Sequence, residues 1–148
     1  MLDLDLVVLK MKAETSSEII RNLGGLMLSK GYVKDSYIEA VLEREKNLPT
    51  GLPIDDFCVA IPHTDSEHVN QSNIGIATLE KPAIFHSMVS PEEILYVELV
   101  FLLAVKDPIL QLELLKNLMS VFQNKELLIA LRNATSKEEV RELLSCLG

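Results

Sequence analysis

The run Leu95–Leu103 constrains the fold of this chain more than any other segment. It reads LYVELVFLL, and the part that follows Glu98 is entirely apolar. A strand that is apolar on both faces is typical of the centre of a sheet that is covered on both sides. The run is also far shorter than the roughly 20 apolar residues that a membrane-spanning helix needs. The sequence therefore predicts an enclosed sheet and no insertion into a membrane.

Other segments supply further strands for such a sheet. Residues 2–8 alternate apolar and acidic side chains at a period of two, which predicts a half-exposed strand. Short apolar runs predict additional strands at residues 57–61, 72–79 and 83–86. Two prolines and a glycine in residues 48–53 predict a loop.

Helical patterns fill most of the remaining chain. A first helix is expected to begin at the hydroxyl residues 15–17 and to stop at Gly31, with Gly24 and Gly25 inside it where another element packs closely. Further helices are expected from residue 35 or 36 to 47, at 110–122, at 125–132, and from the capping box of Ser136 and Glu139 through Leu147. This order of elements predicts an α/β fold with three layers, an α/β/α sandwich.

Length and composition limit the classes of function. The 148 residues are 48% hydrophobic, which is enough for one domain, 1–148, with a sizeable core. The net charge is −8 and Lys and Arg form no stripe, so we expect no nucleic-acid partner and instead an encounter with a basic patch on another protein. Cys58 and Cys146 have no metal or redox spacing and are expected to be reduced thiols. No secretory signal is visible, so the expected location is cytoplasmic.

One histidine stands at the end of a strand-like run. Residues 59–68 read VAIPHTDSEH, and Pro62 cannot donate to a sheet ladder. The strand therefore ends near Pro62 and leaves His63 at its tip, where ligand and catalytic groups of open α/β folds tend to lie. A neutral imidazole is a good nucleophile near pH 7, and the hydroxyls of Thr64 and Ser66 can bind an anion or orient the ring.

Other interpretations of His63 need to be weighed. A single histidine in a loop is most often only a polar residue. His63, Asp65 and His68 resemble a metal site, but zinc sites on loops usually add a cysteine or a third firm ligand, which His86 would have to supply. Cys58 lies in an apolar run rather than an electropositive setting, and the chain has no glycine-rich nucleotide motif, so neither a cysteine nucleophile nor a nucleotide cofactor is expected.

Two motifs at a fixed separation resemble a known family. Residues 44–52 read REKNLPTGL, residues 59–63 read VAIPH, and a second histidine, His68, follows five residues later. The pair resembles the type-2 IIA component of the bacterial phosphoenolpyruvate-dependent sugar phosphotransferase system, the fructose/mannitol superfamily, and is most similar to its galactitol-type branch. The resemblance covers essentially the whole chain, and it implies a mixed sheet between helices.

The resemblance implies a phosphocarrier without a metal or other cofactor. The phosphorylated protein HPr would pass its phosphoryl group to His63, and His63 would pass it to a cysteine of a IIB partner that feeds a membrane IIC transporter. Arg44 matches the family's arginine, whose planar fork of donors suits phosphoryl oxygens. The resemblance does not identify the sugar or sugar alcohol.

The sequence departs from the family pattern at two places, and the first concerns the second polar partner in the site. Mannitol-type members carry another histidine after the long apolar strand, and aligning residues 104–111 with that region puts Ile109 at its place. The role of that second histidine is expected to be absent here or to be taken over by His68 or Gln111. Many members also have glycine where this chain has Thr64.

Two carboxylates, Asp65 and Glu67, follow His63 closely in the sequence. Asp65 and Glu67 would repel a phosphoryl group if they pointed inward, so we expect them to face solvent or to orient an imidazole.

A second function in keeping with the resemblance is a regulatory IIA-like module whose phosphorylation state gates a partner. No DNA-binding segment accompanies the motifs, which favours the transport role.

Overall fold

A five-stranded mixed sheet lies between two layers of helices. The computed structural model describes residues 2–54 and 57–145. In that part of the chain the strands are β1 (Leu2–Met11), β2 (Gly51–Ile54), β3 (Phe57–Ala60), β4 (Asn73–His86) and β5 (Ile94–Ala104). The helices are α1 (Ser16–Ser29), α2 (Tyr37–Asn47), α3 (Pro108–Phe122), α4 (Lys125–Arg132) and α5 (Lys137–Leu143), and a short 3-10 helix covers Ser66–His68.

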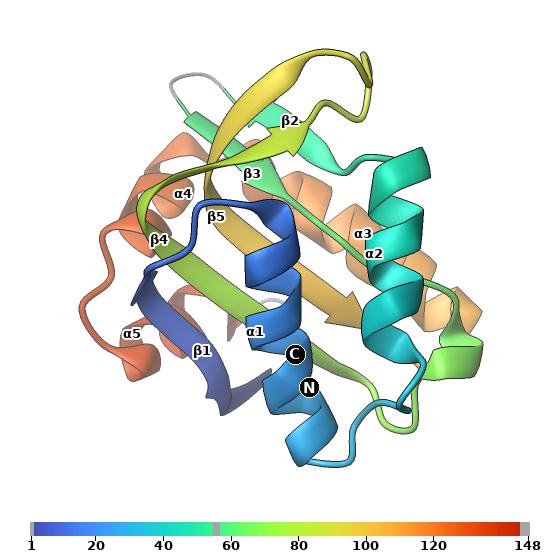
Figure 1. Cartoon of the computed structure of the whole chain (residues 1–148). Coiled ribbons are helices and arrows are strands. Elements are labelled where there is room, and N and C mark those ends of the chain that lie inside the picture. Colours follow the sequence, from blue (N-terminus) through green and yellow to red (C-terminus); the bar gives the residue numbers. More distant parts are fainter. Residues whose placement is uncertain (1, 55–56, 146–148) are drawn as a thin grey trace.

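The strand order is β1-β4-β5-β3-β2 (Figure 1). β4 and β5 form an antiparallel hairpin, and each of them has a parallel neighbour on its other side, β1 for β4 and β3 for β5. β2 pairs antiparallel with β3 and forms one edge. β5 is therefore the central strand, as its apolar run predicts.

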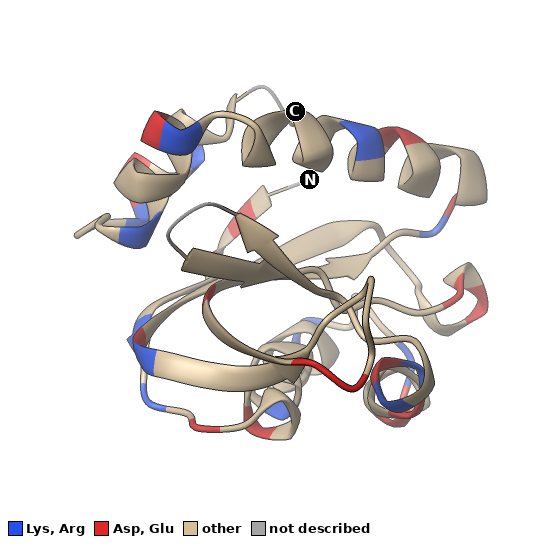
Figure 2. Cartoon of the chain, turned by 90° about the horizontal axis from the view of Figure 1, so that it is seen from above, with Lys and Arg blue, Asp and Glu red and all other residues tan. Residues whose placement is uncertain are grey.

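Two hydrophobic clusters fill the spaces on either side of the sheet. One packs α1 and α2 against one face, with buried side chains such as Leu23 and Val41. The other packs α3, α4 and α5 against the opposite face, with Leu118 and Leu131 among its members. Seen from above, helices lie on both sides of the sheet (Figure 2). Every residue of β5 from Leu99 to Ala104 is at most 1% exposed. The predicted α/β/α sandwich is confirmed.

Side-chain caps fix several helix ends where the sequence predicts them. The Thr15 hydroxyl accepts a hydrogen bond from the Glu18 N–H at 3.2 Å, at the start of α1. At α5 the Ser136 hydroxyl accepts from the Glu139 N–H at 3.1 Å, while the Glu139 carboxylate accepts from the Thr135 N–H. These contacts satisfy amides that the first turn of a helix leaves free.

Three boundaries differ from the sequence predictions. The loop expected at residues 48–53 contains the edge strand β2, in which Pro53 is tolerated because an edge strand leaves some N–H positions unpaired. The runs at 72–79 and 83–86 belong to one strand, β4, with an irregularity in its register between Thr78 and Ala83. α5 ends at Leu143 rather than Leu147, and residues 146–148 lie outside the described residues.

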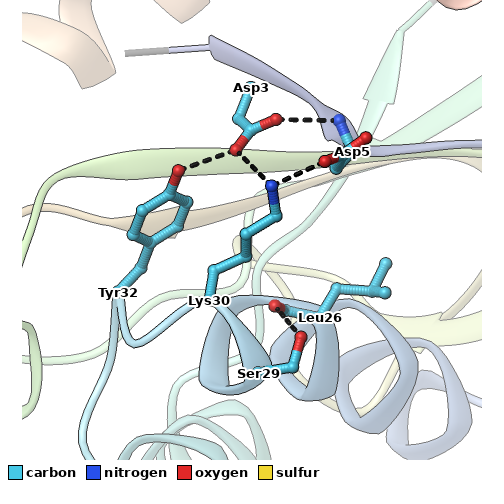
Figure 3. A network of polar contacts seen from close by, with 6 residues as sticks. All are labelled: Asp3, Asp5, Leu26, Ser29, Lys30 and Tyr32. Carbon is cyan, nitrogen blue, oxygen red and sulfur yellow. Dashed lines mark hydrogen bonds and ion pairs between the residues drawn. The ribbon is translucent and has the colours of Figure 1, made fainter.

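A polar network joins the start of β1 to the end of α1 (Figure 3). The Lys30 ammonium lies 2.6 Å from the Asp5 carboxylate and 3.3 Å from that of Asp3, and the Tyr32 hydroxyl donates to Asp3 at 2.7 Å. The Tyr32 hydrogen bond is the main cause that lowers the pKa of Asp3. The network ties the outer strand of the sheet to the helix that covers it.

No helix in the described part of the chain is long and apolar enough to cross a membrane. Cys58 is a free thiol whose pKa is raised by burial, whereas Cys146 falls outside the described residues.

Candidate functional site

His63 lies just beyond the end of β3 on a segment that the neighbouring strand still holds. β3 ends at Ala60, and the Leu103 N–H of β5 donates to the Pro62 carbonyl at 3.0 Å. The histidine is 8% exposed, so most of the residue is enclosed. The structure thus places His63 at the tip of a buried strand.

The backbone determines which ring nitrogen of His63 is available. Nδ1 lies 2.8 Å from the Ile61 carbonyl oxygen, which only accepts, so Nδ1 carries the proton. In the neutral ring Nε2 then keeps a free lone pair. Burial is the largest influence on the ring, and it lowers the pKa of His63; the charge of Arg44 acts in the same direction, and the Ile61 hydrogen bond opposes both. A neutral, Nδ1-protonated imidazole has the form that a nitrogen nucleophile needs near pH 7.

Arg44 stands in the last turn of α2 and acts electrostatically on His63. Its side chain is partly buried, and its Nε–H group is a buried donor without a hydrogen-bond partner in residues 2–54 and 57–145. A buried donor that stays unpaired costs about 1–3 kcal/mol, and such groups are often found where a ligand completes the site. The structure therefore brings together the cation and the imidazole that the sequence singles out.

Glu45 and Thr50 form a contact that the sequence analysis does not assign. Glu45 is 9% exposed, and its carboxylate accepts the Thr50 N–H at 2.9 Å and the Thr50 hydroxyl at 2.7 Å. Burial raises the pKa of Glu45 to about 6, against the lowering effect of the two Thr50 hydrogen bonds. Both residues belong to the REKNLPTGL motif, but spacing alone gives no sign of which partner a buried carboxylate finds.

The predicted supporting residues lie in different surroundings. The His68 ring is hydrogen-bonded through Nδ1 to the Ser36 hydroxyl at 2.8 Å, and its Nε2 lies 3.7 Å from the Glu67 carboxylate. Thr64 is buried next to His63 in the chain. Gln111 is half-buried in the first turns of α3. Their roles in the chemistry of His63 stay predictions.

Asp65, Glu67 and Ile109, the residue at the place of the mannitol-type histidine, are at the surface. Asp65 and Glu67 are both exposed, the orientation that the sequence analysis expects of them. Ile109 is 71% exposed at the start of α3. His86 is exposed as well, and its Nδ1 donates to the Pro91 carbonyl at 2.8 Å.

The metal alternative gains no support from the geometry. No cluster of three or more His, Cys, Asp or Glu side chains able to hold an ion occurs among the residues that the structure describes. His63 and His68 each use Nδ1 for a hydrogen bond, to Ile61 and Ser36 respectively.

A groove of about 550 Å³ lies beside the site rather than at His63. It is bounded by the first turns of α1, by α2 and by the end of β4, and Glu45 is one of its walls. The groove is lined by six ionisable side chains: Arg21, Glu39, Glu43, Glu45, Lys46 and His86. Glu45 thus binds Thr50 and also forms part of the groove wall.

The site and the fold together define a class of protein: an α/β/α sandwich that presents a neutral imidazole and a partly buried guanidinium at the end of a strand. The family profile described as "Phosphoenolpyruvate-dependent sugar phosphotransferase system, EIIA 2" matches residues 1–146. The chain belongs to this family, whose members are phosphotransfer components of sugar uptake.

Individual relatives agree with this assignment. The galactitol-specific EIIA component of Escherichia coli K12 is 32% identical over 82% of this chain and 83% of its own length. The transcriptional regulator ManR of Bacillus subtilis is 36% identical over 68% of this chain but only 14% of its own length. Among solved structures, the complex of enzyme IIAMTL with phosphorylated enzyme IIBMTL from Escherichia coli is similar, with a TM-score of 0.79 and 26% identity over 99% of both chains.

Proposed function

We propose that this protein is a phosphocarrier in which His63 is phosphorylated transiently by phospho-HPr and passes the group to a cysteine of a IIB partner. The observation that carries the proposal is the hydrogen bond of 2.8 Å from His63 Nδ1 to the Ile61 carbonyl. It directs the free lone pair to Nε2. The family assignment supplies the donor and acceptor classes.

The first transfer forms a bond between Nε2 and phosphorus while the bond from phosphorus to the donor breaks. The electron pair of the broken bond stays with the donor, and the ring gains positive character while Nδ1 keeps its proton. The Nδ1–H hydrogen bond to Ile61 then becomes charge-assisted and stronger. In the second transfer a thiolate of the acceptor attacks phosphorus, and the electron pair of the Nε2–P bond returns to the ring. The transfer mainly requires positioning and charge stabilisation.

Arg44 is the charge-stabilising group in this proposal. Its unpaired buried Nε–H is a donor that the incoming phosphoryl oxygens can use, and its positive charge acts on the same region as the His63 ring. A guanidinium binds such oxygens in a bidentate manner. Thr64 is proposed as a supporting polar group, and His68 or Gln111 as the group that takes over from the histidine that Ile109 replaces.

Phosphorylation from phosphoenolpyruvate with enzyme I and HPr tests the proposal. The native protein should gain one acid-labile, alkali-stable phosphoryl group, His63→Ala should gain none, and Arg44→Ala should be labelled about 100-fold more slowly, or slower still, because one preorganised charged donor is lost. Labelling that persists in His63→Ala would contradict the assignment and direct attention to His68 or His86.

The partner and the sugar are finer parts of the proposal. The IIAMTL structure was solved with phosphorylated IIBMTL, which supports a IIB acceptor here, with a IIC transporter beyond it in a cytoplasmic relay. The galactitol-specific relative supports a sugar alcohol as the transported substrate. Transfer of label from the phosphorylated protein to cognate IIB, and uptake of galactitol compared with other hexitols and pentitols, check these two points.

A regulatory role is the second candidate, and the similarity to ManR favours it. In that case phosphorylated His63 would change the affinity for a protein partner instead of delivering the group. Efficient transfer to a IIB cysteine supports transport. A phosphoryl group that stays on His63 in the presence of IIB while altering the binding of another protein supports regulation.

A further inference from the structure

Glu45, the residue after Arg44, connects the end of α2, which carries Arg44, to the chain segment that packs beside His63. Glu45 lies in the last turn of α2, and its two carboxylate oxygens both bind Thr50, through the N–H at 2.9 Å and the hydroxyl at 2.7 Å. Thr50 is itself only 3% exposed. One side chain therefore fastens the end of the helix to the chain segment that enters β2.

The connection continues from Thr50 to His63 through the backbone. The Thr50 carbonyl accepts the Ile61 N–H at 3.4 Å, and the Ile61 carbonyl accepts the proton of His63 Nδ1 at 2.8 Å. Gly51, the next residue after Thr50, pairs with Ala60 in the β2–β3 ladder. Hydrogen bonds made by Thr50 and Ile61 thus link Glu45 to the His63 imidazole, the proposed phosphoryl acceptor.

The chemistry of Glu45 indicates a positional role. Removing a carboxylate from water is unfavourable, and an apolar side chain of similar volume would fill a buried site at lower cost. A carboxylate that accepts from an N–H and an O–H of the same residue holds that residue in both position and orientation, because the two bonds leave little freedom. Arg44 shares the helix turn with Glu45, so the same contact also fixes the backbone position from which the Arg44 side chain extends.

We propose that Glu45 is a positioning residue: by holding Thr50 it sets the relative placement of the His63 ring and the Arg44 guanidinium. This inference rests on the proposed function of His63 as the phosphoryl acceptor. Glu45 does not touch the phosphoryl group in this scheme. It acts through Thr50 and Ile61 on the imidazole and through α2 on the guanidinium.

Three variants and a matched control separate this role from a general effect on folding. Glu45→Gln leaves one acceptor oxygen of the two, Thr50→Val removes the hydroxyl donor and keeps the carboxylate, and Thr50→Ser restores the hydroxyl. Glu43→Gln makes the same exchange as Glu45→Gln at an exposed position of the same helix, where the carboxylate accepts a hydrogen bond from the Asn47 side-chain amide at 3.2 Å.

The first readout is the single-turnover rate of phosphorylation by phospho-HPr over a range of HPr concentrations. Glu45→Gln and Thr50→Val should lower the maximal rate about tenfold or more without raising the half-saturating HPr concentration, because a misplaced acceptor reacts slowly once the donor is bound. Thr50→Ser and Glu43→Gln should stay within about twofold of the native protein. A native maximal rate in both Glu45→Gln and Thr50→Val, or a loss that appears only as weaker binding of HPr, would overturn the proposal.

The second readout does not depend on phosphorylation. The ¹⁵N spectrum of the unphosphorylated His63 ring should show the Nδ1–H form in the native protein and a mixture of the two tautomers in Glu45→Gln and Thr50→Val. If the native protein accepts no phosphoryl group but the tautomer shifts as described, the proposed function fails while the positioning by Glu45 holds. If labelling occurs on His63 but the ring spectrum is the same in all variants, the positioning role is wrong and the phosphocarrier function holds.

Discussion

At the scale of single residues, burial and a nearby cation act in the same direction on His63. Burial lowers the pKa of the ring because an imidazolium loses hydration, and the Arg44 charge lowers it further. A histidine whose folded pKa is depressed adds stability above its unfolded pKa and loses it as the pH falls through the folded value. The same shift keeps Nε2 unprotonated over the neutral range, so electrostatics and reactivity agree at this residue.

We predict that His63 titrates below the ordinary value of 6.5 and that phosphoryl acceptance falls as the pH drops through its midpoint. The physical reason is that the protonated ring offers no lone pair. Removing the cation in Arg44→Ala should move the midpoint upward. A ¹⁵N titration of the ring measures both values, and a midpoint at or above 6.5 in the native protein would refute the prediction.

Glu45 should make the free energy of unfolding depend on pH in the sense opposite to that of His63. Its pKa rises from 4.5 to about 6 on folding, so its contribution is fully present below pH 4.5 and is lost as the pH rises through 6. A shift of this size corresponds to about 2 kcal/mol. We therefore expect the free energy of unfolding of Glu45→Gln, relative to the native protein, to improve by about 2 kcal/mol between pH 4.5 and pH 7.5.

Urea unfolding of Glu45→Gln and of the native protein at both pH values measures this change as a difference between the two proteins. Glu43→Gln controls for the loss of a negative charge from α2. A relative stability of Glu45→Gln that is the same at both pH values would show that Glu45 is not shifted by burial.

The sequence singles out His63 and Arg44 because both lie in motifs with fixed spacing, and their roles in phosphoryl transfer stay predictions. It was insufficient for Glu45, since its role depends on a carboxylate reaching the backbone of Thr50, five residues away across the end of a helix. Nor does sequence separation reveal that His68 bonds to Ser36, which lies 32 residues earlier in the chain.

At the scale of elements, two adjacent glycines in α1 have different surroundings. A Cβ on Gly24 would lie 2.7 Å from Cγ1 of Ile38 in α2, whereas a Cβ on Gly25 would meet nothing within 4 Å. The predicted close packing at this pair is confirmed for Gly24 and wrong for Gly25. The two helices approach closely at one glycine only.

We predict opposite effects of alanine at these two positions. Gly25→Ala should stabilise the protein by up to about 1 kcal/mol, the difference in helix propensity between glycine and alanine. Gly24→Ala should destabilise it by about 1–3 kcal/mol, because Ile38 and the helix behind it must shift. Thermal or urea unfolding of the pair measures this difference directly, and stabilisation by both substitutions would show that α2 yields without cost.

Regular patterns predicted most of the elements, and local chemistry explains the exceptions. The apolar run of β5 and the cap at Ser136 gave the right element types because each depends on neighbouring residues. β2 was missed because its proline and glycine are typical of a loop, whereas the strand is defined by its pairing with β3. β4 was divided into two because the interruption in its pattern marks an irregular register with β5, not a turn.

At the scale of the whole molecule, the charge of the protein should govern how it meets its phosphoryl donor. The net charge is −8. In Figure 2 the Lys and Arg segments are spread over helices and loops and are interspersed with Asp and Glu segments. Net charge of one sign steers a partner of the opposite sign over distances that salt shortens, from about 10 Å at 0.1 M to about 3 Å at 1 M.

We therefore predict that phosphorylation of His63 depends on salt through encounter and not through the transfer itself. Raising NaCl from 0.05 M to 0.5 M should lower the second-order rate constant with phospho-HPr about tenfold or more, and leave the maximal single-turnover rate nearly unchanged. Rapid-quench kinetics separate the two quantities, and an uncharged osmolyte controls for viscosity. A maximal rate that falls in parallel with the second-order constant would instead place the salt effect inside the site, where Arg44 is proposed to pair with the phosphoryl group.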